Sequence, residues 1–416
     1  MGLGWTLSDD DGAYRIPWNV TLPPRQMALL DAVLDAYAGA PPGQTVLDHV
    51  RHLLQKACRM QHIRYDDAWG QPLGALAAAN LDGYGVLSYL LQDDQLEEIA
   101  VVGLNQPIYV YGRQSGWLTT NAALTDLDFA VQCVNRMAQP LGRRLTSRQP
   151  RLSAVLPDGS RLHACMAPVA LSGIQISLRK FRKQPFSMRE LVQSGFLSPF
   201  VAAFLQLAMP SDCSLLVAGN TGSGKTTLLN AVSEFVPLHE RVVVLEDAPE
   251  LRWPHRHQAR LLSGETPLSS LLADTLRMRP DRIIVGEVRR PDEASALFDV
   301  LLSGQAKSAF ATFHADSAAD ALARLQFMGV RPSDLDALQL VAVLQRYSSV
   351  RDGGEKRALV ELGAVHQGRA LPVLDARGKL DSGFFQTRAC LRMQRGHGMD
   401  AASLARRLSV LAEDWR

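Results

Sequence analysis

The run from Gly219 to Thr226 has the glycine, lysine and hydroxyl spacing of a phosphate-binding loop. It follows an apolar run at 214–218 and precedes a helical stretch at 226–236, which is the context that this loop requires. Glycines let the backbone turn its N–H groups toward phosphate oxygens, and Lys225 adds a full charge for the β- and γ-phosphates. The hydroxyl of Thr226 is suited to Mg²⁺. The predicted binding residues are Gly219, Asn220, Thr221, Gly222, Ser223, Gly224, Lys225, Thr226 and Thr227.

A carboxylate ends the apolar run Arg282–Val285, where Glu287 follows a single glycine. In a parallel sheet the carboxyl ends of the strands converge on the ligand crevice. We therefore expect Glu287 to face the γ-phosphate, to orient or polarise the attacking water, and to contact the metal through water.

A second acidic cluster, Glu246, Asp247 and Glu250, follows the apolar run Val242–Leu245. Two neighbouring strands that both end in carboxylates beside a phosphate loop favour a catalytic function. We expect Glu246 and Glu250 to help order Mg²⁺ and water, with Glu246 acting on the metal through water. Asp247 is equally suited to cap a helix or turn.

His314 directly follows a further apolar run, Ala309–Phe313. A lone histidine is more often structural than functional. This one falls at the same expected edge of the sheet as Glu287, and we therefore interpret His314 as a sensor of the γ-phosphate.

The elements that must position these residues form a βαβ rhythm from about residue 200 onward. Continuous apolar runs alternate with helical stretches, as in a doubly wound α/β domain with a mostly parallel sheet. The expected strands are Leu215–Ala218, Val242–Leu245, Arg282–Val285 and Ala309–Phe313.

The residues before about 200 have a different sequence pattern. Short strand patterns surround one helix, Phe129–Leu141, which predicts a small α+β domain. Apolar residues at helical spacing in Gln26–Ala38 and Thr45–Met60 predict a helical N-terminal region. The expected parts are a helical region at 1–85, an α+β domain at 86–183, a linker at 184–200 and a phosphate-loop domain at 201–416. The strands expected in the α+β domain are Glu97–Val102, Ile108–Tyr111, Leu152–Leu156, Leu162–Met166 and Ile174–Arg179.

Composition narrows the class of protein. The 416 residues carry a net charge of +2, so no global charge for nucleic acid is present. Five cysteines without a C-x-x-C pair argue against a zinc module or a disulfide framework and favour a reducing cytoplasm. No run approaches the roughly 18 apolar residues that a membrane span needs.

Together the motifs resemble the type II/type IV secretion ATPase superfamily, which includes type IV pilus, tight-adherence pilus, conjugation and archaeal surface-filament motors. The Gly-Glu-x-Arg ending of the Walker B run is specific to this superfamily. The four boxes appear in order: Walker A at Gly219–Thr226, the aspartate box at Leu245–Leu251, Walker B at Arg279–Arg289 and the histidine box at about Ser303–Ser317.

The resemblance implies a RecA-like ATPase domain preceded by a PAS-like domain, with ATP and Mg²⁺ as cofactors. It implies a homohexameric ring on the inner face of the cytoplasmic membrane, where inter-domain motion would drive an inner-membrane platform protein and move pilin or protein cargo. We expect no direct binding of nucleic acid. By resemblance to the signatures Leu156–Arg161 and Ser177–Phe181, Arg161 and Arg179 are the arginines that would reach the nucleotide phosphates, ahead of Arg148 and Arg151.

Gln305 departs from the family pattern, which has histidine at this position of the histidine box. Glutamine donates a hydrogen bond but cannot take up a proton and become charged, which leaves open a nucleotide-binding regulator with little turnover. A conjugation or DNA-uptake motor of the same superfamily is the other alternative. The basic residues between Arg51 and Arg64 are scattered and are followed by two aspartates, which is more typical of a solvated helix face.

Overall fold

The chain divides into two compact units, Met1–Lys183 and Gln184–Arg416. No helix in the described part of the chain is long and apolar enough to cross a membrane. The computed structural model describes residues 5–7, 13–16, 23–39, 41, 43–112, 115–180, 184–348, 355–375 and 378–416.

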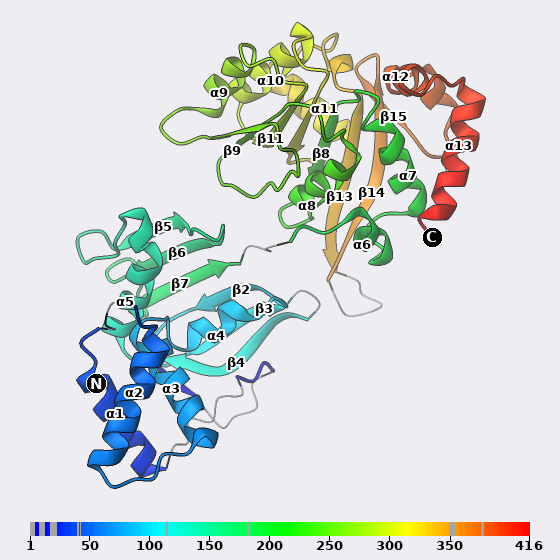
Figure 1. The fold of residues 1–416 in the computed structure, drawn as a ribbon. Helices are drawn as coiled ribbons and strands as arrows, with labels where there is room; N and C mark the ends of the chain where they lie inside the picture. The colour runs from blue at the N-terminus through cyan, green and yellow to red at the C-terminus, as the bar shows by residue number, and fades with distance from the viewer. Residues whose placement is uncertain are drawn as a thin grey trace. The chain divides into compact units, whose positions relative to one another are not determined.

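After the short strand β1 (Trp5–Leu7), the first unit continues with helices that pack pairwise against one another (Figure 1). Side-chain caps fix where they start: Thr45 accepts a hydrogen bond from the backbone N–H of Asp48, and Asp66 accepts one from Ala68. The helical N-terminal pattern is confirmed over the described residues. The helices are α1 (Pro24–Ala36), α2 (Val46–Met60), α3 (Asp67–Leu81) and the short α4 (Val86–Gln92).

An antiparallel seven-stranded sheet follows in this unit, in the order β1-β4-β3-β2-β7-β6-β5, and α5 (Leu127–Ala138) lies against β7. The five strands expected from the sequence are present within one residue at each end, and two others were not expected. The strands are β1 (Trp5–Leu7), β2 (Leu96–Val101), β3 (Pro107–Gly112), β4 (Gly116–Leu124), β5 (Arg151–Val155), β6 (Arg161–Met166) and β7 (Ile174–Arg179).

The second unit contains an eight-stranded sheet in the order β10-β9-β11-β12-β8-β13-β14-β15. The first six strands of this order are parallel, and the last two pairings are antiparallel, so the expected mostly parallel sheet is confirmed. The strands are β8 (Leu215–Gly219), β9 (Val242–Glu246), β10 (Gln258–Leu262), β11 (Arg282–Val288), β12 (Ser308–Phe313), β13 (Leu340–Ser348), β14 (Glu355–His366) and β15 (Arg369–Pro372).

Helices cover both faces of this sheet, which explains why its central strands carry continuous apolar runs rather than alternating patterns. Leu215 and Val217 of β8 belong to one core with α7, α8, α12 and α13, while Leu216 and Ala218 belong to the other core with α9, α10 and α11. Residues 184–200, expected as a linker, are instead part of this unit, because Met188, Leu191 and Phe196 are buried in its core. The helices are α6 (Met188–Gln193), α7 (Pro199–Ala208), α8 (Lys225–Ala231), α9 (Leu268–Thr275), α10 (Pro291–Ser303), α11 (Ala318–Phe327), α12 (Arg388–His397) and α13 (Ala401–Asp414).

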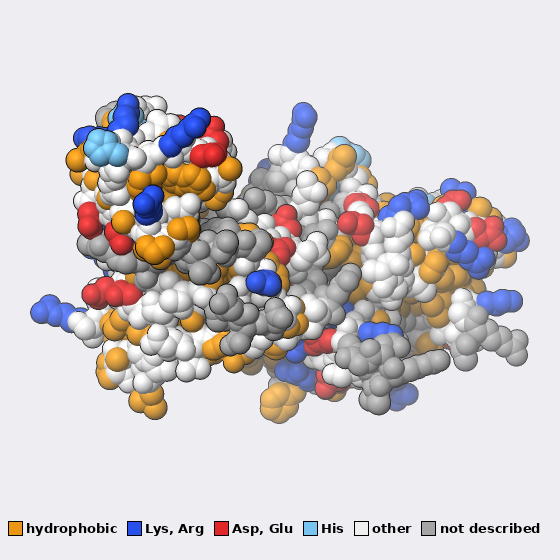
Figure 2. Space-filling model, turned by 90° about the horizontal axis from the view of Figure 1, so that it is seen from below, with side chains coloured by type: hydrophobic (Ala, Val, Ile, Leu, Met, Phe, Trp, Pro, Cys, Tyr) orange, Lys and Arg blue, Asp and Glu red, His pale blue; other side chains and the backbone are white. Residues whose placement is uncertain are grey.

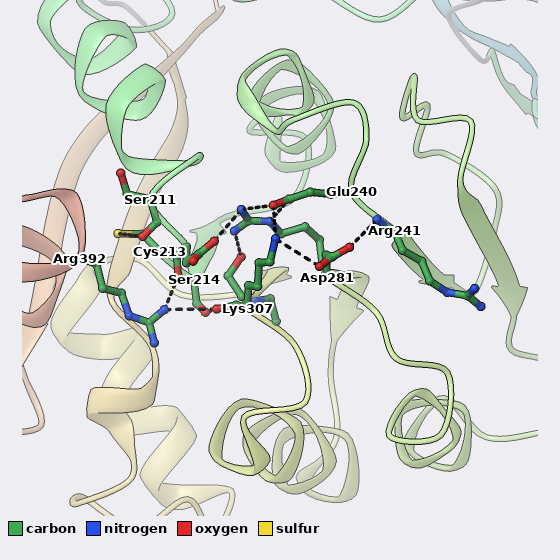
Figure 3. Close-up of polar contacts among 12 residues, drawn as sticks. Ser211, Cys213, Ser214, Glu240, Arg241, Asp281, Lys307 and Arg392 are labelled. Carbon is green, nitrogen blue, oxygen red and sulfur yellow. Dashed lines mark hydrogen bonds and ion pairs between the residues drawn. The ribbon is translucent and has the colours of Figure 1, made fainter. Parts of the chain in front are cut away.

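A buried ion-pair network holds the amino ends of the central strands (Figure 3). Arg282, the first residue of β11, is fully buried and donates through Nε to Glu240 at 2.6 Å. Its other nitrogens contact Asp212 at 2.8 Å and the hydroxyl of Ser308 at 2.6 Å. Lys307 donates to the second oxygen of Glu240 at 2.8 Å. Burial raises the pKa of Glu240, but the hydrogen bonds from Arg282 and Lys307 outweigh it and leave the pKa below its ordinary value.

The same network reaches the carboxy-terminal helices. Arg392 of α12 donates to the backbone carbonyls of Asp212 and of Lys307, the latter at 3.3 Å (Figure 3). The helix is thereby fixed to the loops that enter β8 and β12. All of these contacts lie at the edge of the sheet opposite to the carboxyl ends of its parallel strands.

Candidate active site

The phosphate-binding loop joins the carboxyl end of β8 to the start of α8. Gly219 has a φ of 152°, and a Cβ atom added there would lie 2.2 Å from the carbonyl oxygen of Leu344. Gly224 has a φ of 97° and is the residue that precedes α8. Residues with side chains rarely adopt either conformation, so the loop bends as it does because these positions are glycine.

Lys225 is folded back on its own loop. Its ammonium group donates to the carbonyl oxygens of Gly219 at 2.9 Å and Asn220 at 3.2 Å. Beneath it, the hydroxyl of Ser223 is fully buried and has no hydrogen-bond partner among the described residues. A glycine-lined bend, an ammonium group and a buried hydroxyl that lacks a partner fit the oxygens of bound phosphates.

Three charged or titratable side chains meet above this loop. The Nε2 atom of His314 lies 2.6 Å from Oε1 of Glu287, and its Nδ1 atom lies 3.5 Å from the ammonium nitrogen of Lys225. The contact follows from the sheet order, because β12 lies between β11 and β8. The structure therefore brings together Lys225, Glu287 and His314, as the sequence predicted.

Thr226 and Glu250 form a second pair at the same edge. The Thr226 hydroxyl donates to Oε2 of Glu250 across 3.3 Å. No cluster of three or more His, Cys, Asp or Glu side chains able to hold a metal occurs among the described residues. Mg²⁺ in nucleotide sites uses one or two protein oxygens together with phosphate oxygens and water, and the Thr226–Glu250 pair fits that requirement.

Glu246 occupies a different kind of position. It is 2% exposed, and its Oε1 atom accepts hydrogen bonds from the backbone N–H groups of Glu250 at 2.9 Å and Leu251 at 2.7 Å. Its Oε2 atom accepts one from Arg260 at 2.9 Å. Burial raises the pKa of Glu246 despite these hydrogen bonds. In this structure Glu246 shapes the loop that carries Glu250, and a contact with metal through water stays a prediction.

Arg289 was missed as a site residue by the sequence reasoning, although it stands in the quoted Walker B box. Its Nε and Nη2 atoms donate to Oε2 of Glu287 at 2.9 and 2.6 Å. Its Nη1 atom donates to Oδ2 of Asp247 at 2.5 Å. The Gly-Glu-x-Arg spacing was the available signal, because on a strand end it puts the arginine two residues from the carboxylate and on the same side.

The arginines of the first unit lie on neighbouring strands. Arg161 of β6 is directly opposite Arg179 of β7, and Arg179 is directly opposite Glu98 of β2. The three side chains therefore share one face of the antiparallel sheet. Phe181, the last residue of the second signature, is outside the described residues. A role of Arg161 or Arg179 at the nucleotide stays a prediction.

Gln305 lies away from these groups. It is exposed in the turn between α10 and β12, where its N–H donates to the hydroxyl of Ser303 at 3.2 Å. His314 follows the other end of β12. Within this unit, Gln305 therefore lies at the edge of the sheet opposite to the phosphate-binding loop.

The fold and the site define a nucleotide-binding α/β unit of the phosphate-loop type. A family model described as type II/IV secretion system protein matches residues 119–369, and the chain belongs to this family. A putative conjugal transfer protein of Mycobacterium tuberculosis is 33% identical over 305 residues, which is 69% of this chain and 86% of that protein. The type IV secretion system protein PtlH of Bordetella pertussis is 31% identical over 288 residues, 62% of this chain and 84% of that protein.

Other matches are shorter relative to the protein matched. An uncharacterised protein of Methanocaldococcus jannaschii is 39% identical over 227 residues, which is 51% of this chain but 31% of that protein. For a second uncharacterised protein of the same organism, the matched region is 45% of that protein's length. Among solved structures, the ATPase DotB of Legionella pneumophila has a TM-score of 0.52 at 16% identity, covering 79% of this chain and 86% of that one. This likeness supports the predicted fold class.

Proposed function

We propose that this protein is a Mg²⁺-dependent ATPase that drives a secretion or pilus-assembly system. The observation that carries the proposal is the meeting of Lys225, His314 and Glu287 over a glycine-formed phosphate loop, in a chain of the type II/IV secretion family. The names of its relatives place them in conjugal transfer and type IV secretion, which supports the same class of work.

The side chains have separate tasks in this proposal. ATP with Mg²⁺ supplies the transferable phosphoryl group and the charge that polarises it. Lys225 exchanges its loop carbonyls for phosphate oxygens, and Thr226 with Glu250 holds the metal. Glu287 orients the attacking water, and His314 beside it senses whether the terminal phosphate is present.

The motor function rests on assembly. We propose a homohexameric ring, peripheral on the inner face of the cytoplasmic membrane, in which nucleotide changes the angle between the two units. Arg161 and Arg179 of the first unit would stabilise charge that develops on the phosphates. An inner-membrane platform protein would receive the motion and pass it to pilin or protein cargo.

A DNA-moving motor is the second candidate, because one relative is named for conjugal transfer. Arg51 on α2 lies 3.8 Å from Asp48, and Figure 2 shows basic and acidic side chains interspersed on the face in view. This arrangement gives no support for direct binding of nucleic acid. DNA binding that weakens steeply with added salt would favour this candidate instead.

The proposed activity is tested by steady-state ATP hydrolysis with Lys225→Ala and Glu287→Gln. Loss of Lys225 should weaken ATP binding and turnover together. Glu287→Gln should still bind ATP while turnover falls by about 10²–10⁴-fold, the usual contribution of a positioned base. Lys379→Ala and Glu265→Gln, both at exposed positions, serve as matched controls.

Two results would count against the proposal. Full turnover in Glu287→Gln would remove Glu287 from the reaction. A wild-type protein that binds ATP but hydrolyses none, even with membranes or the platform partner present, would favour the regulator instead.

A further inference from the structure

A continuous line of polar contacts joins the carboxyl ends of three strands. After β10, the hydroxyl of Ser263 donates to Oδ1 of Asp247, which follows β9. The other oxygen of Asp247 accepts from Arg289, which follows β11, and Arg289 in turn holds Glu287. The proposed function assigns a role to Glu287 but none to Arg289, Asp247 or Ser263.

We propose that Arg289, anchored by Asp247, is a positioning residue that sets the orientation of the Glu287 carboxylate for turnover. This inference rests on the proposed ATPase function. Two nitrogens of Arg289 bind the same atom, Oε2 of Glu287, so Oε1 is directed toward His314 at 2.6 Å. Two hydrogen bonds hold Oε2 while Oε1 faces His314, so these contacts favour one orientation of the carboxylate about its last bond.

The contact needs an arginine rather than any positive charge. The guanidinium group is a rigid fork whose three nitrogens reach Glu287 on one side and Asp247 on the other. A lysine ammonium is a point charge on a flexible stem and cannot span both carboxylates in a fixed plane. Arg289→Lys should therefore behave almost like Arg289→Gln.

Asp247 acts through Arg289. Asp247 contacts Arg289 and Ser263, and neither of these belongs to the phosphate loop. The side chains of Arg289 and Asp247 are 50% and 40% exposed, against 18% for Glu287. Exposed ion pairs contribute little to stability, so both positions should tolerate substitution without unfolding.

The test measures kcat and KM for ATP in Arg289→Gln, Arg289→Lys, Asp247→Asn and the double variant Asp247→Asn with Arg289→Gln. We expect kcat of both Arg289 variants to fall by about 10–100-fold, the scale seen when a supporting partner of a catalytic ligand is lost. KM should stay within about twofold, because Lys225 and the loop still bind ATP. Asp247→Asn should lower kcat less, and the double variant should be no slower than Arg289→Gln alone.

Arg277→Gln is the matched control, since Arg277 is 84% exposed and its carboxylate partner lies 3.9 Å away. Unchanged kcat in Arg289→Gln, full rescue by lysine, or losses that multiply in the double variant would each overturn the inference. If Arg289→Gln fails to fold, Asp247→Asn decides, and unchanged kcat there overturns it. A wild-type protein without ATPase activity overturns the proposed function and this inference together, whereas active wild type beside an unaffected Arg289→Gln overturns this inference alone.

Discussion

Replacing Glu240 by glutamine should strongly destabilise the second unit without touching the nucleotide site. Glu240 is 3% exposed and accepts a hydrogen bond from the guanidinium group of Arg282, which is fully buried. Removing one partner of a buried ion pair costs about 3–5 kcal/mol, because the other charge stays buried. In the variant Arg282 still contacts Asp212 at 2.8 Å and Ser308 at 2.6 Å. We therefore expect the loss of unfolding free energy to be at the lower end of this range, about 3 kcal/mol.

Thermal unfolding provides the assay. For a unit of this size, about 3 kcal/mol corresponds to a decrease in Tm of roughly 6–12 °C. Glu265→Gln at an exposed position should leave Tm within about 1 °C, as surface substitutions usually do. A loss below about 1 kcal/mol in Glu240→Gln would show that the buried network is not what holds this edge of the sheet.

The same variant has a defined pH dependence. The folded-state pKa of Glu240 lies below its ordinary value of 4.5, so its ionised form stabilises the fold above that value. As pH falls through the folded-state pKa, the carboxylate protonates and this contribution is lost. The difference in unfolding free energy between wild type and Glu240→Gln should therefore be full at pH 7 and shrink as the pH falls below 4.5 and through the lower folded-state pKa. A constant difference across that range would refute the reasoning.

Two further predictions test the loop and the core. Gly219→Ala forces a Cβ to within 2.2 Å of the Leu344 carbonyl oxygen. We expect it to abolish ATP binding, measured by nucleotide fluorescence. We also expect the free energy of unfolding to fall by at least about 1–3 kcal/mol, measured by thermal unfolding. Burial raises the pKa of Cys213 to about 12 and that of Cys133 to about 11, so a thiol reagent at pH 8 should modify either one only as fast as the protein opens. Rapid labelling of native protein would contradict the packing.

The sequence predicted four strands of the central sheet because each contains a continuous apolar run. The runs that became β8, β9, β11 and β12 are buried on both faces, and short continuous apolar runs beside a phosphate loop permit few other interpretations. The outer strand β10 alternates exposed and half-buried residues, and β14 begins with exposed charged residues. Neither pattern stands out from a loop, and both strands were missed.

The site was predictable to the extent that strand order placed it. Glu287 and His314 were expected at one edge, and the structure places them 2.6 Å apart. The burial of Arg282 was not predicted, because an arginine at the start of an apolar run usually has an exposed side chain at the end of the strand. Its burial depends on Glu240, which is distant in sequence, and no local pattern indicates such a pairing.

The strand β11 has a separate task at each end. At its start Arg282 is fully buried and paired, while beyond its other end Arg289 is 50% exposed and holds Glu287. Desolvation makes the first pair costly to break, whereas solvent weakens the energetic contribution of the second. Substitutions at the Arg282 end should therefore lower stability with kcat retained below the new Tm, and those at the Arg289 end should lower kcat with Tm retained. The buried ion pair of Arg282 fixes the start of β11. The position of the strand therefore does not depend on Glu287, which is less buried and lies near its other end.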